Sequence, residues 1–276
     1  MSEINYRGEL KGNEAKHFAL IGRGLSHSLS AKYFAETIGV RNNADYKLLE
    51  LTDMQSLMEM VEQLHLAGFN VTSPYKIDVM SWLGEMDDVA KEVGAVNAVR
   101  VDYRDDKPYL FGTNTDAQAF SDLLSELHLG CGSTALVLGT GGAARAAAWA
   151  LWRCGVEYAL VSRHPSPGVS IGYDEAVEMI GCTSLLVNAT PVGMEDKDTM
   201  SPWTAWNEVD EGHVVVDFIY EPRQTVFLRE ASSRGAVTVN GYSIFCRQAL
   251  LSYRFWGLVF DEETKGNGYQ QCDDWR

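Results

Sequence analysis

The sequence has no run of basic residues and comparatively few positive charges. Its 276 residues include 23 lysines and arginines against 38 aspartates and glutamates, which gives a formal net charge of −15. Nucleic acids and acidic membrane surfaces are bound by basic patches, and this composition offers none. We therefore expect neither a nucleic-acid partner nor a membrane partner, and any anion that the protein binds must be held locally.

Long apolar runs are also missing. No stretch approaches the roughly 20 uninterrupted apolar residues that a membrane helix requires. The opening segment, MSEINYRGELKGNEAKH, lacks the apolar core of a signal peptide. Both absences favour a cytoplasmic protein.

Cysteine is sparse, and its pattern argues against two kinds of site. The number of cysteines is odd and none are paired as C-x-x-C, so reduced thiols fit better than a disulfide framework. Neither H-x-x-x-H nor paired-cysteine spacing occurs, so no metal is expected. The cysteines are Cys131, Cys154, Cys182, Cys246 and Cys272.

Short apolar runs alternate with helix-like segments from about Phe18 onward. The predicted strands cover residues 18–22, 46–51, 69–72, 135–138, 158–162, 185–188 and 214–218. The predicted helices cover residues 30–38, 54–67, 117–127 and 143–154. Such alternation is typical of α/β units around a mainly parallel sheet, and the chain is long enough for two domains.

Three glycines stand between a predicted strand and an alanine-rich helix in the segment VLGTGGAAR, residues 137–145. Glycine tolerates positive φ and has no Cβ, and a helix N-terminus presents unpaired N–H groups to an anion. In this strand–turn–helix setting G-x-G-x-x-A is the dinucleotide fingerprint. The alternative is a glycine-rich turn for tight helix packing. The residues assigned to the cofactor are Gly139, Thr140, Gly141, Gly142, Ala143 and Ala144.

The end of the next predicted strand distinguishes two cofactors. An NAD site would carry an acid there to hold the ribose 2′-hydroxyl, but the sequence has Ser162 and Arg163. These residues favour the 2′-phosphate of NADP, and the alternative is a solvated surface arginine. Asn188 and Thr190 are expected in the loop beside the cofactor, although a strand-end turn explains them nearly as well.

Polar segments follow the predicted strands of the first half, where α/β folds bind ligands. They are SHSLS (residues 26–30), NVTSPYK (70–76) and GAVNAV (94–99), the last leading to GTNTD (112–116). Small hydroxyls, amides, one lysine and one carboxylate suit a pocket for a polyhydroxylated acid. Isolated serines of this kind are loop or cap residues in most proteins.

Taken together, these motifs resemble those of shikimate dehydrogenases. The resemblance extends from about residue 18 to 257 and follows the family's order: SHSLS, NVTSPYK, GAVNAV, NTDA, GTGGAAR, NATPVGM, DFIYEP and NGYSIFCRQAL. It implies an α/β fold with an N-terminal substrate domain (1–115, mainly parallel sheet, joined by a C-terminal helix at 246–276). It also implies a C-terminal Rossmann-type NADP-binding domain (116–245).

The implied activity is the reversible NADPH-dependent reduction of 3-dehydroshikimate to shikimate, on the route to chorismate and the aromatic amino acids. By resemblance, Lys76 and Asp116 are the catalytic pair, and Gly241 lies with the cofactor ligands. The implied substrate ligands are Ser28, Ser30 and Tyr220 around the carboxylate, and Thr72, Asn97 and Gln248 on the ring hydroxyls. The partner is a small molecule, and a monomer and a homodimer both fit.

The chemistry expected of Lys76 follows from the reaction. Hydride arriving at a carbonyl carbon generates negative charge on oxygen, which a positioned ammonium can stabilise and then protonate. In reverse, the amine acts as a general base, and Asp116 orients it. The alternative is a structural ion pair.

Some positions depart from the family pattern. Arg23, Gly24 and Leu25 replace a usual Asn-Pro entry, Ala117 replaces a glycine, and residues 244–245 are Ile-Phe where Met-Leu is usual. Ser30 favours shikimate over quinate. The alternatives are a quinate/shikimate or amino-shikimate dehydrogenase that uses NAD(P), and a catalytically silent regulator that binds NADP or shikimate.

Overall fold

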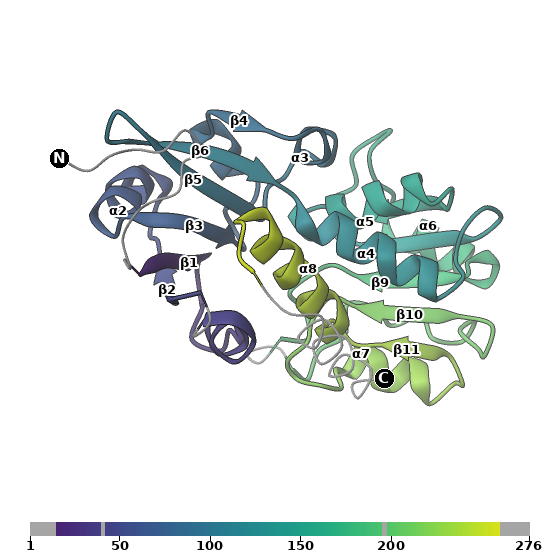
Figure 1. Cartoon of the computed structure of the whole chain (residues 1–276). Helices are drawn as coiled ribbons and strands as arrows, with labels where there is room; N and C mark the ends of the chain where they lie inside the picture. Colours follow the sequence, from purple (N-terminus) through teal and green to yellow (C-terminus); the bar gives the residue numbers. More distant parts are fainter. Residues whose placement is uncertain (1–14, 40–41, 195–197, 260–276) are drawn as a thin grey trace.

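Two β-sheets lie side by side in the computed structural model, which describes residues 15–39, 42–194 and 198–259 (Figure 1). One sheet is built from the first half of the chain and the other from the second half. This arrangement confirms the predicted α/β class with two sheet-based parts. Among these residues no helix has the length and apolar character needed to cross a membrane.

The first sheet has six strands in the order β2-β1-β3-β5-β6-β4. Its strands are β1 (Lys16–Gly22), β2 (Ala44–Glu50), β3 (Leu66–Val71), β4 (Glu85–Met86), β5 (Ala98–Arg104) and β6 (Lys107–Thr113). Its helices are α1 (Ser30–Phe34), α2 (Leu57–Gln63) and α3 (Asp88–Val93). Parallel pairings join β1 to β2 and β3, and β4 to β6, whereas β3, β5 and β6 pair antiparallel. The sheet is mainly parallel, as expected.

The antiparallel hairpin β5–β6 was not among the sequence predictions. Its turn contains Asp105 and Asp106, whose φ angles are 50° and 61°. Positive φ at two adjacent residues is the geometry of a type I′ turn, which matches the twist of the flanking strands. Two aspartates tolerate this conformation less readily than the Asn-Gly pair that usually signals it, so the local signal was weak.

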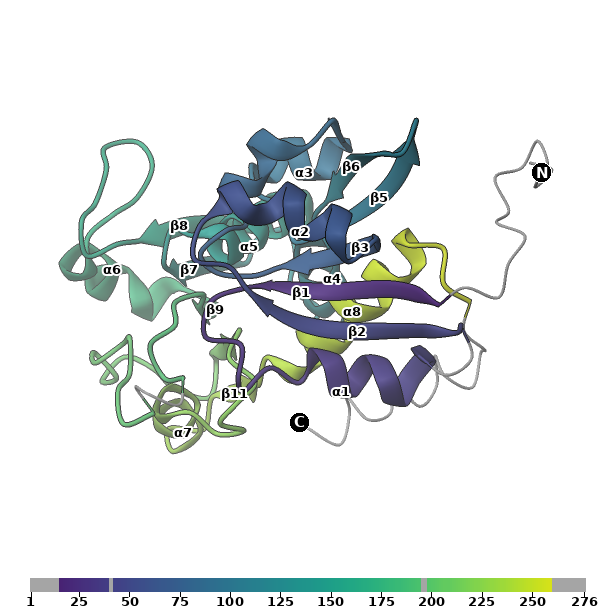
Figure 2. The ribbon, with the colours of Figure 1, turned by 90° about the vertical axis from the view of Figure 1, so that its left-hand side faces the viewer.

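Alternate residues of β1 point to opposite faces of the first sheet. Ala19 and Ile21 pack against the core beneath α2, whereas Phe18 packs against α1 and α8 (Tyr242–Phe255). Figure 2 shows α1 on one side of β1 and β2, with α2 and α3 on the other. The first sheet is therefore covered on both faces, and its inner strands β1 and β3 are largely buried, whereas the edge strand β2 is not.

The second sheet is fully parallel, with the order β11-β10-β9-β7-β8. Its strands are β7 (Thr134–Leu138), β8 (Glu157–Val161), β9 (Leu185–Asn188), β10 (Val214–Asp217) and β11 (Val237–Val239). The helices here are α4 (Thr115–Glu126), α5 (Gly142–Arg153), α6 (Tyr173–Met179) and α7 (Val226–Ser232). The chain starts at β7, moves out to β8 and returns to β9 on the other side. Strand order reverses between β7 and β9, and doubly wound sheets bind ligands outside such a switch point.

Helix α8 connects the two parts of the molecule. It follows β11 of the second sheet, runs alongside α4 (Figure 1), and packs against the first sheet, where Trp256 stacks on Phe18 at 4.6 Å between ring centroids. The Arg247 guanidinium binds the Glu126 carboxylate of α4 at 2.8 Å. This helix therefore follows the second sheet in sequence and packs against both parts of the molecule.

Several predicted boundaries were wrong. The C-terminal helix expected at 246–276 begins at Tyr242 and ends at Phe255, two residues before Gly257 at φ 70°; residues 260–276 lie outside the described part. The helix expected at 54–67 begins as a 3₁₀ turn and continues as α2. It ends earlier than expected, because His65 has φ 47° and β3 begins directly after it. α1 continues as a π-helical turn over residues 35–39.

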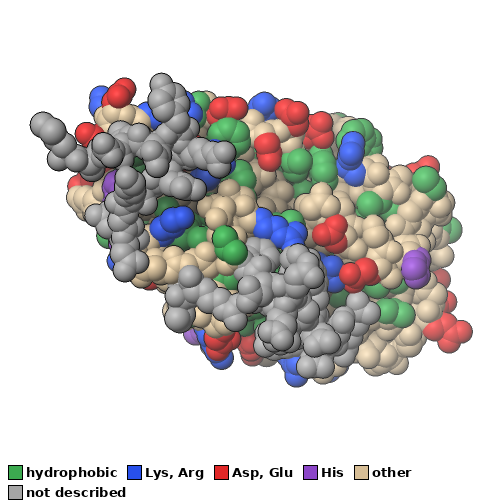
Figure 3. Space-filling view, in the orientation of Figure 1, with side chains coloured by type: hydrophobic (Ala, Val, Ile, Leu, Met, Phe, Trp, Pro, Cys, Tyr) green, Lys and Arg blue, Asp and Glu red, His purple; other side chains and the backbone are tan. Residues whose placement is uncertain are grey.

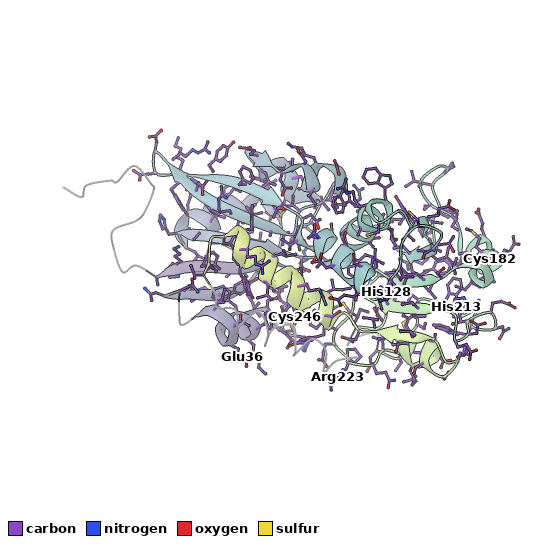
Figure 4. The ribbon with its side chains drawn as sticks, turned by 45° about the vertical axis from the view of Figure 1, so that its right-hand side comes forward. Glu36, His128, Cys182, His213, Arg223 and Cys246 are labelled. Carbon is purple, nitrogen blue, oxygen red and sulfur yellow. The ribbon has the colours of Figure 1, made fainter. Side chains whose placement is uncertain are left out.

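The distribution of charged side chains and the state of the cysteines agree with the sequence analysis. Acidic and basic side chains are interspersed over the face seen in Figure 3. The four described cysteines are free thiols, and Cys246 on α8 lies far from Cys182 (Figure 4). Cys272 lies outside the described residues.

Gly241, the N-cap residue of α8, should tolerate no side chain. A Cβ at this position would lie 2.3 Å from the Phe218 carbonyl oxygen and 2.5 Å from its carbon, and backbone cannot yield as a flexible side chain can. We expect Gly241→Ala to lower the free energy of unfolding by about 1–3 kcal/mol, measured by urea denaturation. Gly130→Ala is the matched control, because its nearest contact would be an ordinary 3.6 Å. Equal stability of the two variants would contradict this packing argument.

Candidate active site

The glycine turn lies at the switch point of the second sheet, between the end of β7 and the start of α5. Gly139 has φ 116°, and a Cβ on it would lie 3.1 Å from the Ala189 carbonyl oxygen. Glycine is therefore required there by backbone geometry and by the neighbouring loop. A Cβ on Gly141 would meet no atom within 4 Å, so open space borders the turn at the N-terminus of α5. An unobstructed helix N-terminus of this kind suits an anionic ligand.

The other residues of the turn divide into exposed and packed positions. Thr140 and Gly141 are exposed, whereas Ala144 is buried in the core against β7 and α4. Ala143, beside it, is half-buried in the first turn of α5. The small side chain of Ala144 lets α5 approach the sheet closely, which is the packing role of the last position in the fingerprint.

Lys76 and Asp116 form a close ion pair. The Lys76 Nζ donates to Asp116 Oδ2 at 2.7 Å, and the two side chains are 17% and 9% exposed. Lys76 follows β3, and Asp116 lies in the first turn of α4, where Asn114 caps the helix by accepting from the Ala117 N–H at 3.0 Å. The predicted pair therefore comes together from segments 40 residues apart.

The stem of Lys76 crosses the glycine turn. A Cβ on Gly142 would lie 3.0 Å from Lys76 Cβ and 3.1 Å from its Cδ. Gly142 belongs to the second sheet's part and Lys76 to the first, so this contact spans the two parts of the molecule. The ammonium, the carboxylate and the glycine turn are thus neighbours, which is the arrangement that the predicted chemistry requires.

A chain of buried polar groups runs behind the ion pair. The Asn97 amide nitrogen lies 3.0 Å from Thr115 Oγ1 and 3.4 Å from Gln248 Oε1, and its oxygen accepts from the Thr115 N–H at 2.7 Å. Because Thr115 precedes Asp116, these bonds also fix the start of α4. The predicted ring-hydroxyl ligands Asn97 and Gln248 are therefore adjacent, next to the carboxylate.

Sequence reasoning missed the supporting members of this chain. The Asn70 amide donates to the Asn97 carbonyl at 3.0 Å and to Ser252 Oγ at 2.9 Å, and Ser252 Oγ lies 3.1 Å from Thr115 Oγ1. Asn70 and Thr115 stand inside quoted motifs, so their positions were available as a signal. Ser252 gave none, because nothing local distinguishes it from any helical serine.

Hydroxyl groups gather at the start of α1. The oxygens of Ser28 and Ser30 lie 3.1 Å apart, and Tyr220 hydrogen-bonds with Ser28. Tyr46, which was not predicted, hydrogen-bonds with Ser30 and donates to Asn70 Oδ1 at 2.8 Å. Burial raises the pKa of both tyrosines above the usual value. Tyr46 uses its single O–H on Asn70, so Tyr220 is the phenol that remains to donate to a carboxylate.

Thr72 lies directly after β3, four residues before Lys76. Its N–H donates to the Ile21 carbonyl at 2.9 Å, and its methyl group sits where a Cβ on Gly22 would fall. The half-buried side chain therefore has its orientation set by the end of β1.

The loop after β8 holds the predicted phosphate ligands. Ser162 Oγ accepts from the His164 N–H and donates to the His164 carbonyl, both at 3.1 Å. These bonds fold the loop into a compact turn and leave the Arg163 side chain exposed. A charged, accessible guanidinium at this strand end suits a phosphate group.

Asn188 lies at the end of β9 and hydrogen-bonds to the loop that follows. Its side chain is fully buried, donates to the Val192 carbonyl and to Asp217 Oδ1, and accepts from the N–H and hydroxyl of Thr190. These four bonds favour the strand-end-turn interpretation for Asn188, with Thr190 held at the surface of the loop. Gly241, also predicted with the cofactor, is needed for close backbone packing against Phe218.

Asp217 at the end of β10 is a buried carboxyl group. It accepts from the N–H of Ile219 (3.0 Å), from Thr225 Oγ1 (2.7 Å) and from Asn188. Burial raises the pKa of Asp217 to about 7, although all three hydrogen bonds favour the ionised form.

One segment, Gly168–Gly172, has the G-x-S-x-G spelling of a hydrolase nucleophile elbow. An elbow places its serine at the sharp turn between a strand and a helix. Here Ser170 lies late in the loop between β8 and α6 and accepts from the Ser166 N–H at 3.0 Å, while Ile171 bridges back to Val161. The segment therefore closes the loop between β8 and α6 through its own hydrogen bonds and does not form a nucleophile elbow.

Residues 20–99 match the model of the shikimate dehydrogenase substrate binding domain. Over 256 residues the chain is 35% identical to an NADP(+) shikimate dehydrogenase of Thermus thermophilus, covering 88% of this chain and 94% of that protein. The chain belongs to the shikimate dehydrogenase family.

Solved structures agree with this placement. A Thermus thermophilus shikimate 5-dehydrogenase in complex with NADP(H) and shikimate is 30% identical, with a TM-score of 0.78 over 93% of this chain and 99% of that one. The Corynebacterium glutamicum quinate dehydrogenase in complex with NAD is 25% identical, with a TM-score of 0.79 over 94% and 100%. Both share the two-part α/β fold described above.

The raised pKa of Asp217 predicts that the stability of the fold depends on pH. The pKa of this carboxyl group is raised in the folded state, so its contribution to stability is complete below about pH 4 and is lost as the pH rises through about 7. Asp217→Asn mimics the protonated acid and does not titrate. Between pH 5 and 7, wild-type stability should fall relative to this variant by up to about 1.4 kcal/mol per pH unit, measured by urea denaturation.

The matched control is Asp210→Asn, because hydrogen bonds from Gly212 and His213 lower the pKa of exposed Asp210. That variant should show no such slope above pH 5. A difference between wild type and Asp217→Asn that stays constant from pH 5 to 8 would contradict the assignment of a raised pKa.

Proposed function

We propose that this protein catalyses the reversible NADPH-dependent reduction of 3-dehydroshikimate to shikimate. The observation that carries the proposal is the 2.7 Å pair of Lys76 and Asp116, with the lysine stem lying against Gly142 of the glycine turn. A proton donor and its orienting carboxylate thus stand at the boundary between a hydroxyl-rich pocket and a dinucleotide fingerprint. Family membership supports the same reaction.

The proposed domain division follows the two sheets. Residues 1–115 and the C-terminal helix form the substrate domain, and residues 116–245 form the NADP domain. Support comes from the first sheet, which lies within residues 16–113, the second, within 134–239, and the packing of α8 against Phe18.

The residues present fit NADP. Open space beside Gly141, the positive φ of Gly139 and the N-terminus of α5 suit a pyrophosphate, and Arg163 suits the 2′-phosphate. The proposed ligands are the backbone and small side chains of residues 139–144, with Ser162, Arg163 and Thr190. Bound NADPH supplies the hydride.

Lys76 performs the proton chemistry in this proposal. As hydride reaches the carbonyl carbon, negative charge grows on the oxygen, and the ammonium at Nζ stabilises it and then donates a proton. Asp116 holds Nζ in place through the bond at 2.7 Å. In the oxidation direction the neutral amine accepts the proton from the substrate hydroxyl.

The substrate is held from two sides. Neutral hydroxyls from Ser28, Ser30 and Tyr220 bind the carboxylate, and Thr72, Asn97 and Gln248 bind the ring hydroxyls. The buried bonds among Asn97, Thr115 and Gln248 support this placement, because they fix the donors before the substrate arrives. All these residues come from one chain, so the activity needs no second copy; a monomer and a homodimer both accommodate it.

Wild-type protein should form NADPH from shikimate and NADP⁺, followed by absorbance, with quinate and NAD⁺ as comparison reactants. Lys76→Ala should lower kcat by about 10²–10⁴-fold, because a positioned acid–base group contributes that much. Lys91→Ala is the matched control, since Lys91 makes only an exposed pair with Asp88. Near-normal turnover in Lys76→Ala would remove the proposed catalyst, and no NADPH from either acid would refute the function.

Neighbouring glycines of the turn should have separable effects. Gly141→Ala fills the open space beside the helix N-terminus, so it should raise the KM for NADP⁺ about tenfold with little change in kcat. Gly142→Ala pushes on the Lys76 stem, so it should lower kcat about tenfold with a smaller change in KM for NADP⁺. Steady-state kinetics distinguish these outcomes, and the opposite pattern would contradict the assigned positions.

A further inference from the structure

Arg23 stands directly after β1. Its Nε donates to the Tyr75 hydroxyl at 2.7 Å and lies 3.4 Å from the Leu51 carbonyl oxygen, and its Nη2 donates to the Thr52 carbonyl. One edge of the guanidinium therefore joins the end of β2 to Tyr75, which lies 52 residues after Arg23 in the chain.

Tyr75 precedes the proposed catalytic lysine. Its ring is 4% exposed within the core of the first sheet, and its hydroxyl donates to the Leu51 carbonyl at 2.7 Å. The phenol oxygen thus donates one hydrogen bond and accepts one from Arg23. Together the two bonds fix the position of the phenol oxygen, so the Tyr75 side chain cannot move away from the end of β2 without breaking the buried bond to Leu51.

A second connection links Arg23 to the same loop. The Arg23 N–H donates to the Ser73 carbonyl at 3.2 Å, and its Cζ lies 5.4 Å from the centroid of the Tyr75 ring. The loop between Thr72 and Lys76 is therefore held at Ser73 through backbone and at Tyr75 through the side chain. Beyond the loop, the Lys76 carbonyl accepts from the Val96 N–H at 2.7 Å.

The arrangement uses properties that only arginine has. Nε and Nη2 lie on one edge of a rigid plane, so they can reach a phenol and carbonyl oxygens together. A lysine at this position would place a single ammonium on a flexible stem and could not satisfy these acceptors with the same geometry.

We infer that Arg23 is a positioning residue for Lys76, acting through Tyr75 without touching the substrate. The inference rests on the proposed function, because the loop matters for turnover only if Lys76 acts on the substrate. Removing the guanidinium leaves the Tyr75 hydroxyl with only its bond to Leu51 and loosens the loop, which moves Nζ relative to Asp116 and the reacting oxygen. Displacements on the order of 1 Å at such a group cost up to about 10²-fold in rate.

The test compares Arg23→Ala, Arg23→Lys, Tyr75→Phe and the Arg23→Ala/Tyr75→Phe double variant with wild type, using shikimate and NADP⁺. Arg104→Ala is the matched control, because Arg104 also stacks on a tyrosine of the same sheet, 3.6 Å from the Tyr109 centroid, but at the far tip of the β5–β6 hairpin. Melting temperature and NADPH affinity by fluorescence are measured for every variant.

We expect Arg23→Ala to lower kcat about tenfold, with NADPH affinity within about twofold of wild type and Arg104→Ala unchanged. Arg23→Lys should restore little of the loss. The double variant should be no slower than the slower single variant, because both substitutions break the same connection.

The outcomes separate this inference from the proposed function. A wild-type protein that does not oxidise shikimate overturns the function itself. An active wild type with Arg23→Ala and Tyr75→Phe both within twofold of its kcat overturns only the role of Arg23. If Arg23→Ala does not fold, normal kcat in folded Arg23→Lys and Tyr75→Phe overturns the role equally.

Discussion

The ion pair of Lys76 and Asp116 is the interaction on which the rest of the site depends. Its partners come from a loop of the first sheet and from the first turn of α4, and the lysine stem rests on Gly142 of the second sheet's part. Three separately positioned segments therefore meet around the Lys76 side chain. Any change in how the two parts of the molecule sit together would alter this contact, and so the fold as a whole serves to fix the position of the ammonium.

Buried hydrogen bonds provide the rigidity that such a site needs. Asn70, Asn97, Thr115 and Ser252 satisfy one another behind the pair, with distances from 2.9 to 3.2 Å among their side chains. Polar groups buried in this way cost stability unless each finds a partner, and here they do. The network is thus a preorganised surface, with Asn97 and Gln248 already side by side where ring hydroxyls are proposed to bind.

The sequence was informative where the physics is local. The glycine turn and its flanking strand and helix were predictable, since positive φ and close packing demand glycine at Gly139 and alanine at Ala144. The residues of the ion pair were recognised through family motifs. The bond from Arg23 to Tyr75 joins distant segments and left no local pattern, so it was missed. The β5–β6 hairpin was missed because its two-aspartate turn is a weak local signal. A strand-end amide such as Asn188 looks the same in sequence whether it binds a ligand or its own loop, so the sequence left both interpretations open.

The central claim is that Lys76 is placed to exchange a proton with the substrate. A crystal structure of the complex with NADP⁺ and shikimate tests it most directly. The account predicts Lys76 Nζ within about 3 Å of the reacting hydroxyl oxygen while it keeps its bond to Asp116, with the nicotinamide facing the same carbon. A shikimate molecule bound elsewhere, or Nζ turned away from that oxygen, would contradict the account.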